Sequence, residues 1–378
     1  MMIKKIIIIP LHLPLNYPCD YIDQTAKVLS QKNTVILFDY YHQYSWKNLL
    51  KKNNLKIFLN SIFNILKSKK LVYFRPFAIF PFQRFKIINK INQFFGYLLL
   101  SLIIEFIKKK AIIWQFFPLI KSFFIKKLFK QIFIYDCVDY LDEKIHEKKI
   151  INEEKTIIKK SDYVAFNSLP LAKAKGANLN NKKFIITYCG CDFDQFNIIP
   201  FIMNKENIAI FYGIFDYRIN VSILKKTIND NTNWQFLLIG PVEEKNHPPK
   251  KDFLNLLKIK NVLYLGKKPK NELANYLKKA KIGLIPYDTS YNFVKYSNPM
   301  KTYEYLAAGL PVLSTEILSL KQYPKEIVYT TDNPQEFSKT LDFLTKNWNI
   351  KKALKAKEIA KTNSWENKIE IILKKTNL

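Results

Sequence analysis

Arginine, glycine and cysteine are scarce in this chain of 378 residues. Its basic residues are 58 lysines and only three arginines, Arg75, Arg84 and Arg218, and it has eight glycines and four cysteines. Ile, Asn and Lys are abundant together, a bias that A/T-rich codons produce without selection for binding. The net charge of +30 is therefore weak support for a nucleic-acid partner. The few arginines and glycines that persist are more informative.

The cysteines and histidines lack the spacing of a metal site. No Cys-x-x-Cys pair occurs among Cys19, Cys137, Cys189 and Cys191, and no ligand spacing among His12, His42, His146 and His247. This excludes a disulfide framework and a zinc site as leading interpretations. We expect no metal, no cofactor and a reduced, cytoplasmic protein.

Long apolar runs are missing as well. Ile3–Ile9 follows a basic start, but no small-residue cleavage site comes after it, so it predicts a buried strand and not a signal peptide. The run Phe94–Ile104 ends at Glu105 and is too short to span a bilayer. The sequence predicts no transmembrane helix.

Acidic residues are almost absent from one long stretch. Between Lys51 and Tyr135 there are 17 lysines or arginines and one acid, Glu105. Basic residues interleaved with Phe and Tyr suit an anionic membrane surface, an anionic lipid-linked acceptor or single-stranded nucleic acid. Core packing also explains the aromatic residues. The stretch 51–135 thus suggests peripheral attachment to the inner face of the membrane as a hypothesis. Without a nucleic-acid motif, no nucleic-acid partner is expected.

Short apolar runs alternate with helical periods along the whole chain, a pattern typical of parallel sheets with crossover helices. The first half predicts strands at Ile3–Ile9, Thr34–Phe38, Leu71–Phe74, Ala111–Gln115, Ile132–Tyr135, Tyr163–Phe166 and Phe184–Thr187. Its clearest helix runs from Phe85 to Lys108. The second half predicts strands at Ile208–Tyr212, Trp234–Ile239, Val262–Leu265, Ile282–Pro286, Pro311–Ser314 and Glu326–Thr330. The stretch 197–207, broken by Pro200, separates the two.

The segment Asn298–Val312, NPMKTYEYLAAGLPV, carries the most specific chemistry. Asn298 and Pro299 predict an extended entry into a helix that ends at Gly309. Free amides at a helix N-terminus suit a diphosphate, and Lys301 adds a full charge there. Glu304, one turn further, can accept two hydrogen bonds from a ribose diol. An ordinary capped helix with Glu304 in solvent is the alternative.

This segment resembles the signature of GT-B-fold glycosyltransferases, particularly the retaining family-4 group (glycosyl transferases group 1). IAIFYGIFDYRIN at 208–220, NWQFLLIGPV at 233–242 and the stretch 261–288 also resemble family segments, and YCGCDFDQF resembles the family's hinge strand. The resemblance is weaker before Tyr188. It implies an α/β fold of GT-B architecture, in which two facing Rossmann-like doubly wound domains enclose an interdomain cleft. Residues 1–197 would bind the acceptor and 205–345 the nucleotide-sugar donor, while 346–378 would cross back toward the N-terminal domain.

The resemblance also implies roles for individual residues. Glu304 would bind the nucleotide ribose, Gly213 would let the backbone approach the diphosphate, and Arg218 with Lys301 would stabilise the leaving group as catalytic residues. Lys225 or Lys226 could assist Arg218. The full set of predicted donor-binding residues is Gly213, Arg218, Gly266, Pro286, Tyr296, Asn298, Pro299, Lys301 and Glu304. Asp136 and Asp139, which follow a predicted strand, are candidates for the acceptor side.

One position departs from the family pattern. Many members carry a second glutamate eight residues before the helix glutamate, where this chain has Tyr296, so the identity of the sugar is open. The N-domain histidine of the family is also not evident, because the corresponding strand reads WQFFP. The expected function is transfer, with retention, of a sugar from a nucleoside-diphosphate donor to a polysaccharide or lipid-linked glycan. A GT-B nucleotide-sugar epimerase and a basic nucleic-acid-binding protein are the alternatives.

Overall fold

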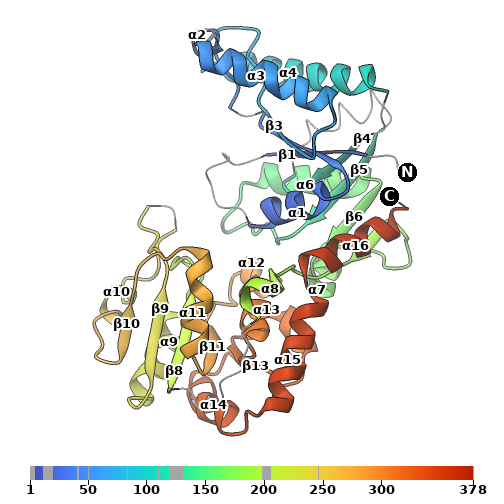
Figure 1. The fold of residues 1–378 in the computed structure, drawn as a ribbon. Coiled ribbons are helices and arrows are strands. Elements are labelled where there is room, and N and C mark those ends of the chain that lie inside the picture. Colours follow the sequence, from blue (N-terminus) through green and yellow to red (C-terminus); the bar gives the residue numbers. More distant parts are fainter. Residues whose placement is uncertain are drawn as a thin grey trace.

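The chain folds into two α/β domains, seen one above the other in the computed structural model (Figure 1). The structure describes residues 5–11, 20–40, 42–49, 51–82, 84–108, 111–118, 131–197, 206–245 and 247–377. His12 and Cys19 lie outside these ranges. Each domain is built on one parallel sheet whose strands the alternating sequence pattern predicts.

The N-terminal sheet has the strand order β3-β2-β1-β4-β5-β6-β7. Its strands are β1 (Ile6–Pro10), β2 (Thr34–Phe38), β3 (Leu71–Phe74), β4 (Ala111–Gln115), β5 (Ile132–Cys137), β6 (Tyr163–Phe166) and β7 (Phe184–Ile186). Its described helices are α1 (Asp20–Ser30), α2 (Trp46–Leu49), α3 (Lys52–Leu66), α4 (Lys86–Phe106), α6 (Lys148–Lys160), α7 (Leu169–Ala174) and α8 (Phe193–Phe196). Most of these strands are buried on both faces, as parallel sheets require.

The C-terminal sheet repeats this topology in the order β10-β9-β8-β11-β12-β13. Its strands are β8 (Ile208–Tyr212), β9 (Gln235–Ile239), β10 (Val262–Tyr264), β11 (Ile282–Ile285), β12 (Val312–Ser314) and β13 (Val328–Thr330). The helices are α9 (Val221–Asp230), α10 (Phe253–Leu256), α11 (Leu273–Lys279), α12 (Asn292–Lys295), α13 (Met300–Ala307), α14 (Pro334–Lys346), α15 (Ile350–Thr362) and α16 (Trp365–Lys375), with 3-10 turns at Lys270–Glu272 and Leu318–Gln322.

In both sheets the order in which successive strands are added reverses next to the first strand. The reversal lies between β1 and β4 in one sheet and between β8 and β11 in the other. In doubly wound folds, ligands bind outside the carboxyl ends of the strands at such a switch point. The predicted strands are confirmed within a few residues at each end. The topology therefore already limits where a ligand site can be.

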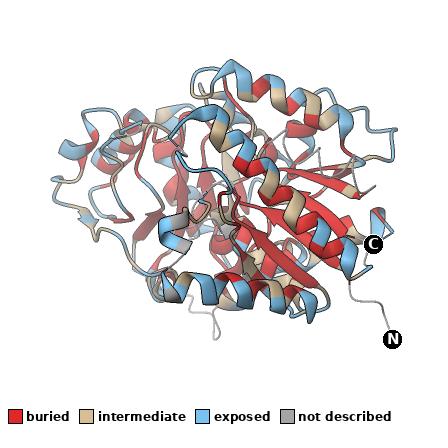
Figure 2. Cartoon of the chain, turned by 90° about the horizontal axis from the view of Figure 1, so that it is seen from above, coloured by how far each residue is buried: buried red, intermediate tan, exposed pale blue. Residues whose placement is uncertain are grey.

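Three buried clusters form the cores. In the N-terminal domain one cluster joins Tyr97 and Leu100 of α4 to one sheet face, and a second joins α1 to the other face. Ile369 and Ile372 of α16 belong to this second cluster, so the last helix packs on the N-terminal domain, whereas Ala356 of α15 packs in the C-terminal core. Figure 2 shows the strands buried and the outer helix faces exposed.

Among the described residues, α4 is the one helix long and apolar enough to cross a membrane by length and composition. The helix Phe85–Lys108 predicted from the sequence is confirmed at Lys86–Phe106. Its apolar stretch is longer than the run Phe94–Ile104, because apolar residues near its start extend it on the same helix.

Candidate active site between the domains

A cavity of about 630 Å³ lies between the domains at the carboxyl ends of both sheets. From the N-terminal domain, Val138, Asp139, Asn167 and Cys189 line it, each just after a strand. From the C-terminal domain it is lined by residues after β8, β9 and β11 and by the start of α13. The cavity thus occupies the place that the strand topology favours.

Two glycines shape the floor of the cavity. Gly213 follows β8 with a φ of +140°, and a Cβ there would lie 2.9 Å from Lys301 Nζ. Gly240 follows β9 with a φ of +144°, and its Cβ would lie 1.8 Å from the Gly213 carbonyl oxygen. Residues that carry a side chain rarely adopt such backbone angles. The two loops therefore need glycine, and the backbone at Gly213 lies close to the Lys301 ammonium group.

Two cations flank the ring of Tyr287. Lys301, in the first turn of α13, donates a hydrogen bond to the Tyr287 hydroxyl, and its Nζ lies 4.7 Å from the ring centroid. The Arg218 guanidinium carbon lies 5.7 Å from the same centroid. The structure therefore brings together the two residues predicted to be catalytic, although they are 83 positions apart in the chain.

Arg218 is held in place by Asp216. Its Nε donates to Oδ1 and Oδ2 at 2.9 Å each, and its Nη2 donates to Oδ2 at 2.7 Å. Burial opposes the charge, but Tyr287 and Asp216 outweigh burial and raise the pKa of Arg218 above its ordinary value. Among the described residues Nη1 has no hydrogen-bond partner, so this edge of the guanidinium can face an anion.

Glu304 is buried in the wall of the cavity. Its Oε2 accepts a hydrogen bond of 2.6 Å from the Tyr212 hydroxyl, and its Oε1 lies 3.7 Å from Lys270 Nζ. Burial, together with Glu304, raises the pKa of Tyr212 well above its ordinary value, so this hydroxyl stays a donor. A carboxylate oxygen can accept more than one hydrogen bond. The anchored carboxylate therefore still has capacity for a ligand diol.

The N-terminus of α13 opens into the cavity through Asn298, Pro299, Met300 and Lys301. No side chain caps it among the described residues. Asn298 does not cap it because its amide is used elsewhere: Nδ2 donates to the Asn167 carbonyl at 2.7 Å, and Oδ1 accepts from Tyr303 at 2.8 Å. The first amides of the helix are thus available to an anionic ligand.

Comparison with known proteins agrees with this geometry. Residues 192–363 match the family model of glycosyl transferases group 1. A Bacillus subtilis (strain 168) protein named as a teichuronic acid biosynthesis glycosyltransferase, TuaH, is 26% identical over 286 residues, which cover 69% of this chain and 70% of the relative. The chain thus resembles the glycosyl transferases group 1 in its C-terminal half, and it resembles a named glycosyltransferase over 69% of its length.

Solved structures extend the similarity of fold to 99% of the chain. HepE of Anabaena, crystallised with UDP, superposes with a TM-score of 0.70 at 10% identity and covers 99% of this chain and 100% of its own. A sucrose-phosphate synthase of Thermosynechococcus elongatus superposes with a TM-score of 0.69 at 13% identity, covering 99% and 98%. At these identities the likeness concerns the fold, and the predicted GT-B architecture is confirmed.

Three residues predicted to bind the donor are not among those that line the interdomain cavity. Gly266 accepts a hydrogen bond from Gly240 through its carbonyl, and Pro286 accepts one from Asn220. Tyr296 stacks on Tyr140 of the other domain, with ring centroids 5.0 Å apart. Next to two of these residues, Lys267 and Tyr287 line the cavity instead. The roles of Gly266, Pro286 and Tyr296 in donor binding stay predictions.

Of the two acceptor-side candidates, only Asp139 faces the cavity. Burial raises the pKa of Asp139 above its ordinary value, and Arg218 and His146 partly offset this effect. Asp136 is instead fully buried and lies 3.1 Å from Lys368 Nζ of α16. The prediction for Asp136 was wrong, because this strand residue points to the sheet face that α16 covers.

The loop after β5 also joins the two domains. Asp142 accepts a hydrogen bond of 3.3 Å from the Phe293 amide, and Lys144 Nζ donates to the Ser290 carbonyl at 3.1 Å. The His146 ring stacks on Phe293. Together with Asn298 and Tyr296, these contacts fix the spacing of the two cavity walls.

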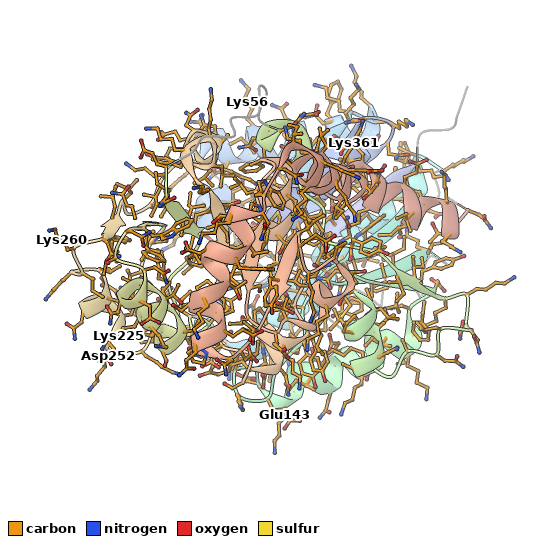
Figure 3. The ribbon with its side chains drawn as sticks, turned by 90° about the horizontal axis from the view of Figure 1, so that it is seen from below. Lys56, Glu143, Lys225, Asp252, Lys260 and Lys361 are labelled. Atoms are coloured by element: carbon orange, nitrogen blue, oxygen red, sulfur yellow. The ribbon has the colours of Figure 1, made fainter. Side chains whose placement is uncertain are left out.

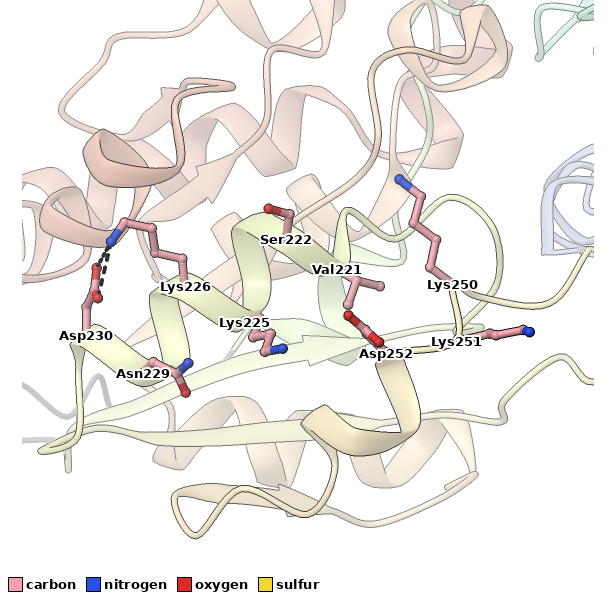
Figure 4. A pocket seen from close by; sticks show the side chains of 9 residues that line it. All are labelled: Val221, Ser222, Lys225, Lys226, Asn229, Asp230, Lys250, Lys251 and Asp252. Atoms are coloured by element: carbon pink, nitrogen blue, oxygen red, sulfur yellow. Dashed lines mark hydrogen bonds and ion pairs between the residues drawn. The ribbon is translucent and has the colours of Figure 1, made fainter.

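A second, open basin of about 560 Å³ lies on the outside of the C-terminal domain. Figure 4 shows Lys225 and Lys226 of α9 at this basin, with Lys226 paired to Asp230. Neither lysine lines the interdomain cavity. The suggestion that they assist Arg218 is therefore not supported by their position.

Sequence reasoning missed several residues of the site. Tyr212 and Tyr287 hold Glu304 and Lys301, Asp216 holds Arg218, and Lys270 faces Glu304. Only Asp216 had a local signal, since it stands two positions before Arg218. Among the described residues, no group of three acids, histidines or cysteines could hold a metal ion.

Proposed function

We propose that this protein is a glycosyltransferase that binds a nucleoside-diphosphate sugar, with UDP as the first candidate nucleotide, and transfers its sugar with retention to a polysaccharide or lipid-linked glycan. The observation that carries the proposal is the convergence of Arg218, Lys301, Glu304 and Gly213 on one interdomain cavity. Two cations, free helix amides and a buried carboxylate are what a ribose and a diphosphate need.

The proposed chemistry places the diphosphate as the leaving group. When the bond between sugar C1 and the diphosphate oxygen breaks, negative charge grows on that oxygen, and Lys301, Arg218 and the first amides of α13 stabilise it. These groups are fixed before the reaction by Tyr287 and Asp216. Preorganised donors of this kind lower a barrier efficiently. On this basis we expect activity to persist in EDTA.

The N-terminal wall would place the acceptor. Asp139 is its acid, whereas burial raises the pKa of the Cys189 thiol to about 12, which keeps it protonated at neutral pH. Among the described residues of this wall, Asp139 is therefore the candidate for a nucleophile. Retention is inferred from the family-4 resemblance, and NMR of the anomeric proton in the first product tests it. A product of inverted configuration would contradict this part of the proposal.

UDP as the nucleotide and a cell-envelope glycan as the acceptor rest on the relatives. HepE was crystallised with UDP, and TuaH is named for teichuronic acid biosynthesis. The cytoplasm is the location that fits, because Cys137, Cys189 and Cys191 are free thiols.

Thermal unfolding with a panel of nucleoside diphosphates tests the donor assignment. We expect stabilisation by at least one of them at millimolar concentration. Glu304→Ala should remove most of the shift, whereas Glu316→Ala, an exposed glutamate of the same domain, should keep it. Absence of any shift in a folded sample would refute the proposal. An isomerised nucleotide sugar formed without acceptor would identify an epimerase instead.

A further inference from the structure

Helix α4 carries apolar side chains on its exposed face as well as on its buried face. Its inward face buries Asn92, Gln93 and Ser101 beside Tyr97 and Leu100. Its outward face carries large apolar side chains at helical spacing, namely Ile87, Ile91, Leu102 and Phe106. Surface helices of soluble proteins normally turn such residues toward the core. The exposed apolar stripe runs along almost the full length of the helix.

The inward polar residues hold α4 firmly on the domain. Asn92 accepts from the Phe80 amide at 2.8 Å and donates to the Phe80 carbonyl at 2.9 Å. Gln43 donates to the Asn92 carbonyl at 2.7 Å. Pulling α4 out of the domain would break these contacts and expose the core around Tyr97. The helix can therefore present its apolar stripe to a partner, but it cannot leave the domain at low cost.

Helix α3 adds a second apolar stripe. Leu55, Leu59, Phe63 and Leu66 follow one another at helical spacing and are all exposed. Helices α3 and α4 lie side by side at the end of the molecule away from the C-terminal domain (Figure 1). Exposed apolar stripes on two neighbouring helices are typical of an interaction site. We call the outward surfaces of these two helices the α3–α4 face.

The charge around this face has one sign. Residues 51–108 contain eleven lysines or arginines and one acid, Glu105. Lys56, Lys86 and Lys90 are exposed beside the apolar stripes, and Lys67 lies over the Phe63 ring at 4.2 Å. Apolar and aromatic side chains within a ring of lysines are typical of a surface that enters the headgroup layer of an anionic bilayer.

We propose that the α3–α4 face docks the protein on an anionic lipid bilayer, with α4 lying in the plane of the membrane. The hydrogen bonds of Asn92 argue against insertion of α4 across the bilayer. A second copy of the chain is a poor occupant, since docking would bring two strongly basic faces together. Docking at this end leaves the interdomain cavity accessible.

Sedimentation with vesicles tests the proposal on the full chain. We expect binding to vesicles of equal parts phosphatidylcholine and phosphatidylglycerol, and little binding to phosphatidylcholine alone. Leu102→Glu combined with Phe106→Glu should weaken binding roughly tenfold or more. These side chains are 54% and 78% exposed, so the variant should fold.

A matched control lies in the C-terminal half. Phe343→Glu combined with Leu354→Glu changes the charge equally at side chains that are 58% and 60% exposed, and it should bind like the wild type. Lys86→Glu with Lys90→Glu should weaken binding, whereas Lys258→Glu with Lys260→Glu should weaken it much less. Figure 3 shows Lys56 and Lys260 projecting outward from different parts of the molecule.

Several outcomes would overturn the proposal. These are equal binding to neutral vesicles, unchanged binding of the α4 variant, equal loss in both apolar variants, or a dimer in solution that only the α4 variant dissociates. Nucleotide-induced stabilisation of each variant is measured in parallel. Because docking and nucleotide binding are separate measurements, failure of one leaves the other intact.

Discussion

The two walls of the interdomain cavity differ in charge. The C-terminal wall contains Arg218, Lys267, Lys268, Lys270 and Lys301 around the buried Glu304. The N-terminal wall, apart from the residues of α16, contains one acidic side chain among the described residues, that of Asp139. Lys368, which α16 adds, is paired with Asp136. One domain thus supplies nearly all the charge for an anionic ligand, and the other supplies shape and a single acid. Substitutions on the two walls should therefore fail in different ways.

The largest effect is expected beneath the N-terminal wall, at the buried pair of Asp136 and Lys368. Asp136→Ala leaves a buried lysine without its partner, which costs about 3–5 kcal/mol of unfolding free energy. Denaturant unfolding measures this loss, and adding Lys368→Met should recover most of it. If the single variant is as stable as the wild type but has a higher KM for the acceptor, Asp136 acts in binding and our correction is wrong.

On the C-terminal wall, Lys301→Ala should lower kcat by about 10²–10³-fold, because it removes a preorganised donor at the leaving group. Stability should change little, since Lys301 is only partly buried. Steady-state kinetics with the identified donor provides the measurement. Lys295→Ala, on the neighbouring helix α12, is the control. An equal loss of kcat in both variants would contradict the assignment of Lys301 to the leaving group.

Between the walls, Asn298→Ala should cost about 1–3 kcal/mol, because the buried Tyr303 hydroxyl loses its bond to Asn298, retaining the one with Tyr323, and the hydrogen bond to Asn167 disappears. The readout is the midpoint of thermal unfolding without nucleotide. Asn298→Asp keeps the acceptor for Tyr303 but not the donor, so it separates the two contributions. A normal midpoint in both variants would show that the interdomain contact adds little.

The smallest effect is expected at Asp139. Its pKa is raised in the folded state, so the folded protein binds more protons than the unfolded chain above the usual carboxyl range. Stability therefore falls as pH rises through that window. Asp139→Asn should be more stable than the wild type at neutral pH, and the gain should shrink as the pH falls toward 3.8, the ordinary pKa of an aspartate side chain. Thermal unfolding of the variant and the wild type, measured over the same pH range, tests this prediction. A variant that is less stable than the wild type at neutral pH would contradict it.

Much of the C-terminal wall could be predicted from local sequence. Lys301 and Glu304 stand in a short segment whose turn and helix signals place them in the first turns of a helix. Gly213 and Arg218 were predicted from the resemblance to a family. Tyr287 and Tyr212 could not be predicted, because nothing near them in the chain indicates that their hydroxyls meet Lys301 and Glu304. A strand-end tyrosine looks the same whether it faces a cavity or the core.

The N-terminal half was predicted less completely, and α4 illustrates the reason. The sequence gives its length and its basic surroundings, but an apolar stripe at helical spacing predicts a face directed at a core. Here both faces are apolar: Leu100 and Ile104 are buried beside Asn92, whereas Leu102 and Phe106 are exposed. Which side of a helix faces inward depends on what the rest of the chain packs against it.

By itself, the sequence determined the two alternating α/β halves, their strands and the donor-site motif, because side-chain period and turn residues act over a few positions. Tertiary structure alone decided that Asp136 meets Lys368 across 232 positions, that Asp139 faces the cavity, and that α4 points its apolar stripe outward. Those outcomes depend on which segments, far apart in the chain, pack against each other and exclude water between them. Burial is a property of the assembled chain.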